Sequence, residues 1–291
     1  MKLAKIILGA KNTDWGKIKD IIKLYAIAGV DIFDLCANSE IIDAAKLMLK
    51  NLKLGAIPKI CASITLEDDI HATKVHIIEQ NCCACARCVA VCPQNAISVD
   101  NFAHINISKC TGCRVCTNFC RNNAIEIFNL NQTFEEQFSQ AQNADYIEIH
   151  TNGRNKNLYE IFEFLAKNFQ KDLGICISQN NNTEEKIHII EKIKEIIAPR
   201  KLIVQADGNS ISGFDNKIAT TEKAIEECRN FQNIKNIILI ASGGTNMKTS
   251  ALAEKTNTKI DGIAWGSFAR KLFDENDSLA KAKELIETIK K

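Results

Sequence analysis

Two runs of four cysteines with the same spacing lie between residues 82 and 120, and they constrain the fold more than any other feature of the chain. Each run reads C-x2-C-x2-C-x3-C, and the second begins 28 residues after the first (110 minus 82). The tripeptide Asn-Ala-Ile follows each run at the same offset, at 95–97 and 123–125. The region is therefore an internal duplication, and a repeated unit that gathers four thiols predicts a pair of metal sites.

The spacing within each run is that of a [4Fe–4S] cluster site. A tight C-x2-C-x2-C loop supplies three thiolates to one cuboidal cluster, and in two-cluster ferredoxins the fourth cysteine of each run binds the other cluster. The sequence therefore predicts two [4Fe–4S] clusters with exchanged fourth ligands. The ligands expected for the first cluster are Cys82, Cys85, Cys88 and Cys120. Those expected for the second are Cys110, Cys113, Cys116 and Cys92.

A pair of structural zinc sites is the alternative, because C-x2-C is also a zinc-binding spacing. Zinc gives no role to the third spaced cysteine or to the ending at Pro93, so iron–sulfur is favoured. The second run carries Arg121 in place of that proline, which predicts a wetter cluster near a positive charge. Cys83 is an additional thiol, either a surface cysteine or a ligand that can replace Cys82.

Length and charge are those of a globular protein with a large core. The chain has 291 residues, of which 46% are hydrophobic, and its formal net charge is only +2. This balance predicts no nucleic-acid partner and no anionic membrane surface. The N-terminus lacks a secretory signal pattern, and no apolar stretch reaches the roughly 20 residues of a membrane span. Of 13 cysteines, eight have metal-binding spacing, so we expect a reducing, cytoplasmic location rather than disulfides.

Outside the cysteine region, short apolar runs alternate with amphipathic helical patterns. Continuous apolar runs are typical of parallel strands buried on both faces. The expected strands are Lys5–Gly9, Asp31–Cys36, Lys59–Ile64, Tyr146–His150, Leu173–Ser178, Leu202–Asp207, Ile237–Ser242 and Gly262–Gly266. The expected helices are Trp15–Ala28, Ser39–Leu54, Phe134–Gln142, Leu158–Phe169, Thr183–Ile197, Thr220–Arg229, Lys248–Asn257 and Leu279–Ile289. Ser39 and Thr183, each followed by acidic residues, are the expected N-caps of their helices.

Eight strand–helix units in order predict an α/β fold, a (β/α)8 TIM-like barrel, with an open doubly wound sheet as the alternative. The cysteine region falls between the third strand and the third helix, as a ferredoxin-like insertion with two clusters. The expected domains are the first part of the barrel, the insertion and the rest of the barrel: 1–69, 70–130 and 131–291. Since βα loops lie at the C-terminal face of a barrel, the clusters are expected over its mouth.

Polar side chains end several expected strands and, by the two-residue alternation of a strand, share faces at the mouth. These pairs are Asp34 with Cys36, Glu148 with His150, Cys176 with Ser178, and Gln205 with Asp207. The cysteines are better explained as small buried hydrophobes. Glu148 and His150 need a partner or a function because an unpaired buried ionisable group is costly, although they could simply satisfy each other or the backbone. No catalytic residue is assigned on this basis.

Glycine-rich loops follow the last two expected strands. Gly243, Gly244 and Thr245 follow the seventh strand, and Gly266 and Ser267 follow the eighth. In barrels these loops often bind phosphate, because glycine lets the backbone approach the anion and helix N-termini donate to it. The alternative is that the glycines only turn each strand into its helix. Flavin mononucleotide is the candidate ligand beside iron–sulfur clusters, although no flavin-specific residue stands out.

Three segments of the C-terminal half resemble a known family. They are LIVQADGNSISG at 202–213, IASGGTN at 240–246 and GIAWGSFARKL at 262–272. Together with the N-terminal ILGA…AGVDIFDLCAN and the two cysteine runs, they resemble the light-dependent-period iron–sulfur proteins, which are redox-sensing, circadian-input proteins of photosynthetic bacteria. The resemblance covers nearly the whole chain and implies iron–sulfur binding with a redox-linked regulatory role. It implies no established catalytic reaction.

Two classes of function remain open. The first is a redox-sensing or electron-transfer protein whose cluster state acts on a partner, either a redox protein or a quinone-like small molecule. The second is an iron–sulfur oxidoreductase that passes electrons to a flavin or a phosphorylated ligand in the barrel mouth. Two clusters at ferredoxin spacing favour electron transfer over a purely structural role. Whether the chain is an enzyme is left open by the sequence.

Overall fold

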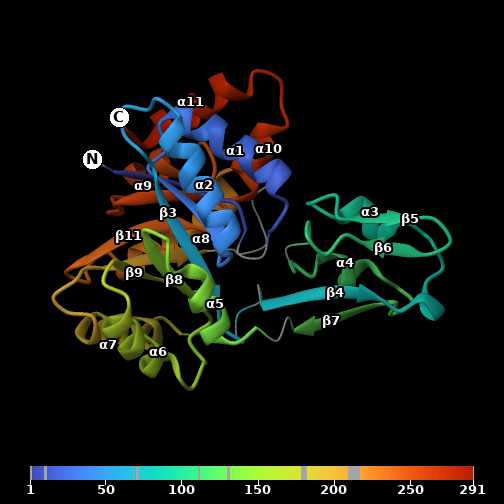
Figure 1. The fold of residues 1–291 in the computed structure, drawn as a ribbon, viewed down its shortest axis with the longest axis horizontal. Helices are drawn as coiled ribbons and strands as arrows, with labels where there is room; N and C mark the ends of the chain where they lie inside the picture. Colours follow the sequence, from blue (N-terminus) through green and yellow to red (C-terminus); the bar gives the residue numbers. More distant parts are fainter. Residues whose placement is uncertain are drawn as a thin grey trace.

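Eight parallel strands close into a barrel in the computed structural model of the chain (Figure 1). The structure describes residues 2–9, 12–67, 69, 72–110, 112–129, 132–177, 182–208 and 217–290. The barrel strands, in their order around the barrel, are Leu3–Ile7 (β1), Ile32–Cys36 (β2), Lys59–Thr65 (β3), Tyr146–Thr151 (β8), Asp172–Ile177 (β9), Leu202–Asp207 (β10), Ile237–Ser242 (β11) and Gly262–Trp265 (β12). The predicted (β/α)8 barrel is confirmed, and the open doubly wound sheet is wrong.

Helices surround the barrel and connect its strands. They are Trp15–Ala28 (α1), Ser39–Asn51 (α2), Phe134–Ala141 (α5), Leu158–Asn168 (α6), Thr183–Ile196 (α7), Ile218–Phe231 (α8), Thr249–Lys255 (α9), Ser267–Phe273 (α10) and Ser278–Lys290 (α11). Each expected helix is present, with ends shifted by less than one turn. The additional helix α10 has seven residues, too few for its periodicity to stand out in the sequence. Within the described residues, no helix is both long and apolar enough to span a membrane.

Two local expectations are wrong by a small shift. The first strand begins at Leu3 rather than Lys5 and ends before Gly9, whose φ of 108° lies outside the extended region. The N-caps of α2 and α7 are Asn38 and Asn182, one residue before the expected Ser39 and Thr183. Each asparagine has an extended backbone, and its side-chain oxygen accepts the N–H three residues further on, which is the geometry a cap requires.

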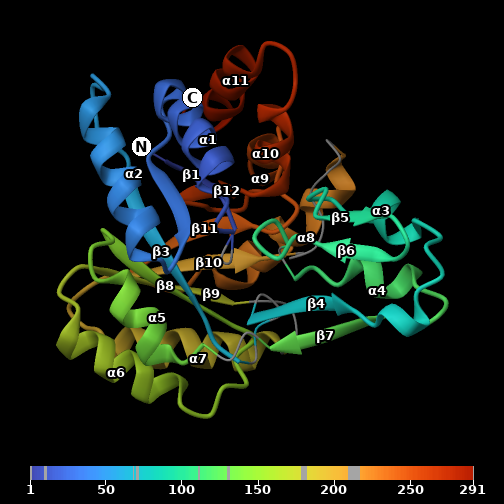
Figure 2. The same cartoon turned by 45° about the vertical axis from the view of Figure 1, so that its right-hand side comes forward.

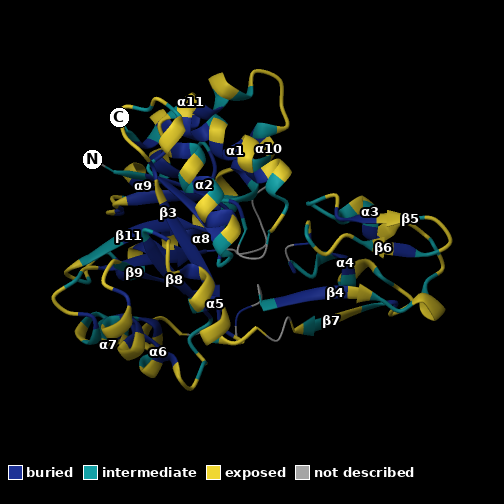
Figure 3. Cartoon of the chain, in the orientation of Figure 1, coloured by how far each residue is buried: buried dark blue, intermediate teal, exposed yellow. Residues whose placement is uncertain are grey.

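The hydrophobic core lies on both sides of the barrel wall. β2, β8, β10 and β12 are buried along their whole length, as expected of parallel strands covered on the outside by helices. Figure 3 shows exposed residues along the helices that surround the barrel. Inside the barrel, one apolar cluster consists of Ile32, Cys61, Tyr146, Ile203, Ile240 and Ala264. Two residues further along four of these strands, on the same inward face, stand Asp34, Ser63, Glu148 and Gln205. The alternation therefore places polar groups inside the barrel on the mouth side of this apolar cluster.

Between β3 and α5 the chain forms two small antiparallel sheets, residues 73–129, here called the cluster module (Figures 1 and 2). Its strands pair as Thr73–Ile77 (β4) with Ile125–Asn129 (β7), and as Ile97–Val99 (β5) with Ala103–Ile105 (β6). Its helices are Glu79–Asn81 (η2, a 3-10 turn), Arg87–Val91 (α3) and Val115–Phe119 (α4). The module thus begins after one barrel strand and returns before the next helix, at a single βα connection.

The internal duplication is visible in the backbone of the cluster module. Ala86 and Arg114, 28 residues apart, precede α3 and α4 with φ angles of 58° and 60°. Asn95 and Asn123, also 28 apart, have φ angles of 49° and 50°. Left-handed conformations cost energy for residues with a Cβ, so they persist only where the surrounding structure requires them. Both cysteine loops therefore fold in the same way.

Gly208 allows the end of β10 to approach α8 closely, and this gives a test of the packing. A Cβ at this position would lie 2.2 Å from the Ala224 backbone nitrogen, so Gly208→Ala should destabilise the fold by about 1–3 kcal/mol through overpacking. Gly55→Ala is the matched control, because a Cβ there meets nothing within 4 Å and should cost less than about 0.5 kcal/mol. Urea unfolding followed by circular dichroism measures both. Equal midpoints for the two variants would contradict the close approach.

Candidate functional site

The cluster module brings the eight spaced cysteines together in two cavities. The first cavity is lined by Cys82, Cys85, Cys88 and Cys120, with Cys83 beside them. The second is lined by Cys92, Cys110, Cys113 and Cys116. Each cavity thus has three cysteines from one run and one from the other.

Backbone N–H groups point at several of these sulfur atoms. The N–H of Ala96 donates to Cys92 Sγ at 3.3 Å, and the N–H of Ala124 donates to Cys120 Sγ at 3.2 Å, at equivalent positions of the two halves. The N–H of Ala103 also donates to a sulfur of the first cavity, at 3.3 Å. Donors of this kind stabilise negative charge on sulfur and tune the potential of a bound cluster.

The donor set fits iron–sulfur binding. Burial raises the pKa of Cys116 to about 12, and the neighbouring Cys113 and Cys110 act in the same direction because adjacent thiolates repel one another. Burial likewise raises the pKa of Cys88 in the first cavity. Thiols such as Cys116 and Cys88 become thiolates when a cation binds them. An all-sulfur set is the one that Fe–S clusters and zinc select.

The two cavities differ in exposure. In the first cavity Cys85 is exposed, as is the neighbouring Cys83, and the exposed Arg121 also lines it. In the second cavity, Cys110 and Cys116 are buried. The first cavity is therefore the one closer to solvent.

Lys74, the second residue of β4, places a buried cation beside the second cavity. Its Nζ donates to the carbonyl oxygen of Ile107 at 2.9 Å and also to that of Cys110. Burial lowers the pKa of this ammonium from its usual value. Lys74 could not be recognised from the sequence, because one lysine in an alternating strand has the same pattern as a solvent-facing residue.

A second set of polar side chains lies inside the barrel, with Lys5 at its centre. The Nζ of Lys5 lies 2.9 Å from Asp34 Oδ2 and 2.8 Å from Glu148 Oε1, and all three side chains are fully buried. Burial by itself lowers the pKa of Lys5, but the two carboxylates more than offset it and raise the pKa well above its usual value. Lys5 is therefore a permanent cation at the centre of the barrel.

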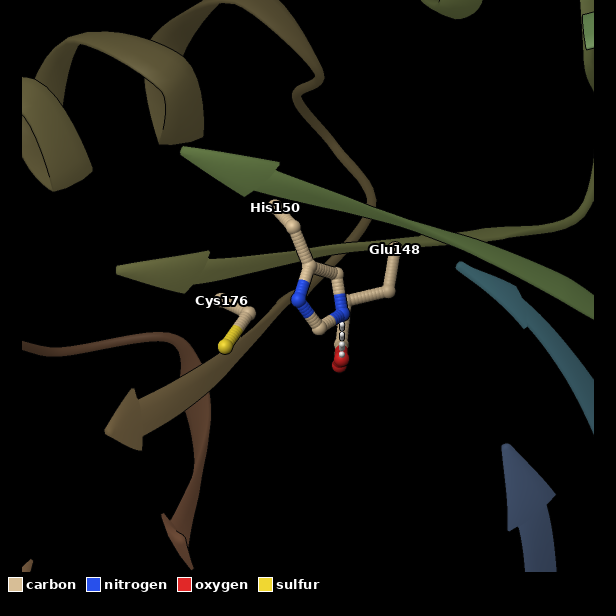
Figure 4. Close-up of side chains that lie close together, drawn as sticks. All are labelled: Glu148, His150 and Cys176. Atoms are coloured by element: carbon tan, nitrogen blue, oxygen red, sulfur yellow. Dashed lines mark ion pairs between the residues drawn. The ribbon is translucent and has the colours of Figure 1, made fainter. Parts of the chain in front are cut away.

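His150 extends this network toward the mouth (Figure 4). Its Nε2 lies 3.0 Å from Ser63 Oγ and 3.2 Å from Glu148 Oε1, and the Ser63 hydroxyl also donates to Asp34. Glu148, His150 and Cys176 converge, with one potential ligand atom from each within 4.8 Å of the others. Such a set could hold a metal ion.

Charge balance accounts for the convergence without a metal. Lys5 already donates to both carboxylate oxygens of Glu148, at 2.8 and 2.9 Å, and its ammonium would repel a divalent ion. Two carboxylates and one ammonium leave one negative charge, which a His150 imidazolium neutralises. Burial lowers the pKa of His150, but the contacts with Cys176 and Glu148 outweigh it and raise the pKa well above its usual value. Burial opposes ionisation of Glu148, yet Lys5 and His150 lower its pKa to about 2.

Three further residues expected at the mouth are buried: Gln205, Asp207 and Cys36. Gln205 donates through Nε2 to Cys176 Sγ at 3.2 Å. Asp207 is buried at the end of β10, and the Cys36 thiol donates to a backbone carbonyl oxygen at 3.1 Å. Ser178, also expected there, lies outside the described residues.

The glycine loops have the backbone that requires glycine. Gly243 and Gly244 have φ angles of 73° and 89°, which residues with a Cβ rarely adopt. The hydroxyl of Thr245 donates to a β12 carbonyl oxygen at 2.5 Å, so it ties one loop to the next strand. Gly266 precedes α10, and Ser267 lines a cavity between the barrel and the cluster module. The joint anion site expected from these loops stays a prediction.

Two family models match the chain. One, described as the light dependent period A C-terminal domain, matches residues 138–290, which is more than half of the chain. The other, a 4Fe-4S dicluster domain, matches residues 74–129 and so coincides with the cluster module. No curated protein sequence matches the chain.

Solved structures of low sequence identity share the barrel. A truncated 3-deoxy-D-arabino-heptulosonate 7-phosphate synthase from Thermotoga maritima is 12% identical, with a TM-score of 0.53 and coverage of 99% of this chain and 85% of that one. A tryptophan synthase from Mycobacterium tuberculosis is 9% identical, with a TM-score of 0.53 and coverage of 99% and 92%. At such identities the likeness concerns the fold alone.

The charge network inside the barrel can be tested by removing its cation. Lys5→Met leaves Asp34 and Glu148 buried without their partner and should lower the free energy of unfolding by about 3–5 kcal/mol at neutral pH. In this variant burial raises the carboxyl pKa values above those of the unfolded chain, so the folded protein binds more protons and the loss should shrink as pH falls. Chemical denaturation at several pH values measures this.

The control is Lys59→Met, which removes a half-exposed ion pair with Asp172 whose atoms lie 2.8 Å apart. Exposed pairs contribute at most about 1 kcal/mol. Two results would show that the network does not carry the charges described. One is a decrease in the free energy of unfolding for Lys5→Met no larger than that of the control. The other is a decrease that becomes larger toward low pH.

Proposed function

The chain belongs to the light dependent period A C-terminal domain family and is an iron–sulfur protein, and on this premise we propose that it carries two [4Fe–4S] clusters and acts as a redox sensor or electron carrier. The observation that carries the proposal is the division of the spaced cysteines between two cavities. Three thiols from one run and a fourth from the other is the ligand pattern of two-cluster ferredoxins.

We assign the ligands accordingly. The first cluster is held by Cys82, Cys85, Cys88 and Cys120. The second is held by Cys110, Cys113, Cys116 and Cys92. When bound, each cluster supplies one-electron redox chemistry.

The residues around the cysteines give the two clusters different properties. The Lys74 ammonium, hydrogen-bonded to the Cys110 carbonyl oxygen, stabilises negative charge at the second cluster and so favours its reduced form. The first cluster, whose ligand Cys85 is exposed, is the one that a redox protein or a quinone-like molecule reaches from solvent. This difference supports an electron path from the accessible cluster to the buried one.

We also propose the expected division into residues 1–69, 70–130 and 131–291, with the middle part as a ferredoxin-type insertion. The pairing of β4 with β7, which begins with Thr73 opposite Asn129, supports it because the chain enters and leaves the module side by side.

An iron–sulfur oxidoreductase is the second candidate function, and the network of Lys5, Glu148 and His150 favours it. These groups lie inside the barrel, and His150 stands toward the strand ends where barrel enzymes carry out their chemistry. A flavin such as flavin mononucleotide, or a phosphorylated ligand, would receive the electrons.

The visible spectrum of anaerobically purified protein separates the candidates, because a flavin adds resolved bands to the broad cluster absorbance. Cluster absorbance without those bands would remove the flavin from the proposal.

The exchanged ligands give a sharp prediction. Anaerobic reconstitution should yield about eight iron and eight sulfide ions per chain. Cys92→Ser lies in the first run, yet it should alter the same electron paramagnetic resonance signal as Cys113→Ser and leave intact the signal that Cys85→Ser alters. The reason is that the fourth thiolate of each run binds the opposite cluster.

Cys83→Ser is the control, because a thiol outside both ligand sets should be dispensable for both signals. Near four iron per chain, or stoichiometric zinc, would contradict two clusters. A Cys92→Ser spectrum that matches Cys85→Ser would contradict the exchange of ligands.

A further inference from the structure

A cavity of about 630 Å³ lies between the barrel and the cluster module. Residues of α1 and α10 form its barrel side, and residues 90–95 with Lys109 form much of its module side. Both views of the fold show α1 and α10 on the side of the barrel that faces the module (Figures 1 and 2). Cys92, assigned above to the second cluster, is part of the wall. A molecule in this cavity would therefore lie beside that cluster.

Positive charge prevails in the cavity lining. The charged residues are Lys17, Lys109, Arg270, Lys271, Asp14 and Asp274, a net charge of +2 (four minus two). Lys17 is paired with Asp274 at 2.9 Å, and the Asp14 side chain caps α1. Cations line the cavity from the barrel side and from the module side, which is the arrangement expected for binding an anion between the two.

Arg270 is the cation that the fold holds in place. Its Nη1 donates to the carbonyl oxygen of Ile7 at 2.7 Å, which fixes the guanidinium at the end of β1. Its Nε is shielded from solvent and has no hydrogen-bond partner among the described residues. Burial lowers the pKa of Arg270 to about 10, with no carboxylate acting against it, so the group remains charged at neutral pH.

Arg270 is half-buried, and a guanidinium that has lost part of its hydration without gaining an anionic partner among the described residues is costly unless something binds it. Its planar fork of donors matches phosphate and carboxylate oxygens better than any other side chain does. Ser267, one turn earlier on α10, also lines the cavity and adds a hydroxyl donor. Lys109 adds a charge from the module side.

We propose that this cavity binds a small anionic molecule, through a phosphate or carboxylate group held by Arg270, Ser267 and Lys109, and binds it more tightly when the second cluster is oxidised. The anion site rests on the cavity itself, and only its redox dependence rests on the proposed function. Reduction adds one negative charge beside Cys92, which repels the bound anion. The ligand must in turn lower the reduction potential of that cluster, because linkage between two binding events is reciprocal. The oxidation state of the second cluster thereby sets how much of the protein holds the ligand.

The experiment uses reconstituted full-length protein with inorganic phosphate and succinate as probes. Calorimetric titration under anaerobic conditions should show binding of one or both probes, with higher affinity for the oxidised protein than for electrochemically reduced protein. Saturating probe should lower the midpoint potential of the second cluster by about 59 mV for each tenfold ratio of the two affinities. Binding of phosphate alone identifies a phosphate ligand, and binding of succinate alone a carboxylate ligand.

Matched variants locate the site. Arg270→Gln should weaken binding at least tenfold, and Lys109→Gln, at an exposed position where folding is not at risk, should weaken it several-fold. Arg200→Gln is the control: that guanidinium donates to the carbonyl oxygens of Phe169 at 2.6 Å and Ala166 at 3.2 Å and does not line the cavity, so affinity should be unchanged.

Absence of binding of either probe at millimolar concentration would overturn the anion site, as would binding that both Arg270→Gln and Lys109→Gln leave unaltered. Equal affinity in the two redox states, in protein whose iron content and cluster signals are intact, would overturn the linkage alone. If the reconstituted protein binds the probes but shows no cluster signals, the result would instead count against the proposed function.

Discussion

The pairing of β3 with β8 is the contact on which the arrangement of this molecule depends. The two strands are neighbours in the barrel although the cluster module lies between them in the chain, and their ladder runs up to Thr65 opposite His150. The side chain of Gln137 on α5 secures the end of β3, accepting the N–H of Thr65 at 3.1 Å and donating to its carbonyl oxygen at 2.9 Å. Because the chain must leave and return at this one edge, the module stands at the mouth of the barrel and beside α1 and α10.

The molecule therefore has two polar regions, and they differ in whether their charges are paired. Inside the barrel, Lys5, Asp34, Glu148 and His150 satisfy one another, so that each buried charge has a partner of opposite sign. In the cavity under the module, Arg270 has a carbonyl oxygen but no carboxylate among the described residues. Buried charges that balance stabilise a fold only weakly. A charge left without a partner at a cavity wall is the stronger indication of a ligand.

Much of this organisation could be predicted from the sequence, and the exceptions have physical reasons. Cysteine spacing is local and chemically specific, and strand–helix alternation has a strong period, so the barrel and the position of the module follow from them. Lys5 could not be recognised, because a lysine between Ala4 and Ile6 has the pattern of a residue that faces solvent. In the barrel those apolar neighbours face the helices, and Lys5 therefore points inward. Arg270 lies on a helix too short to show a pattern, and its environment comes from segments distant in the chain.

The antiparallel pair of β4 and β7 at the base of the module has a consequence for how such a chain can change. The two strands lie side by side where the chain enters and leaves, so whatever is placed beyond them does not alter the distance that the barrel connection must span. A unit attached in this way can be gained, lost or replaced by recombination without redesign of its host. The same barrel can thus carry inserted modules of different size at this one connection.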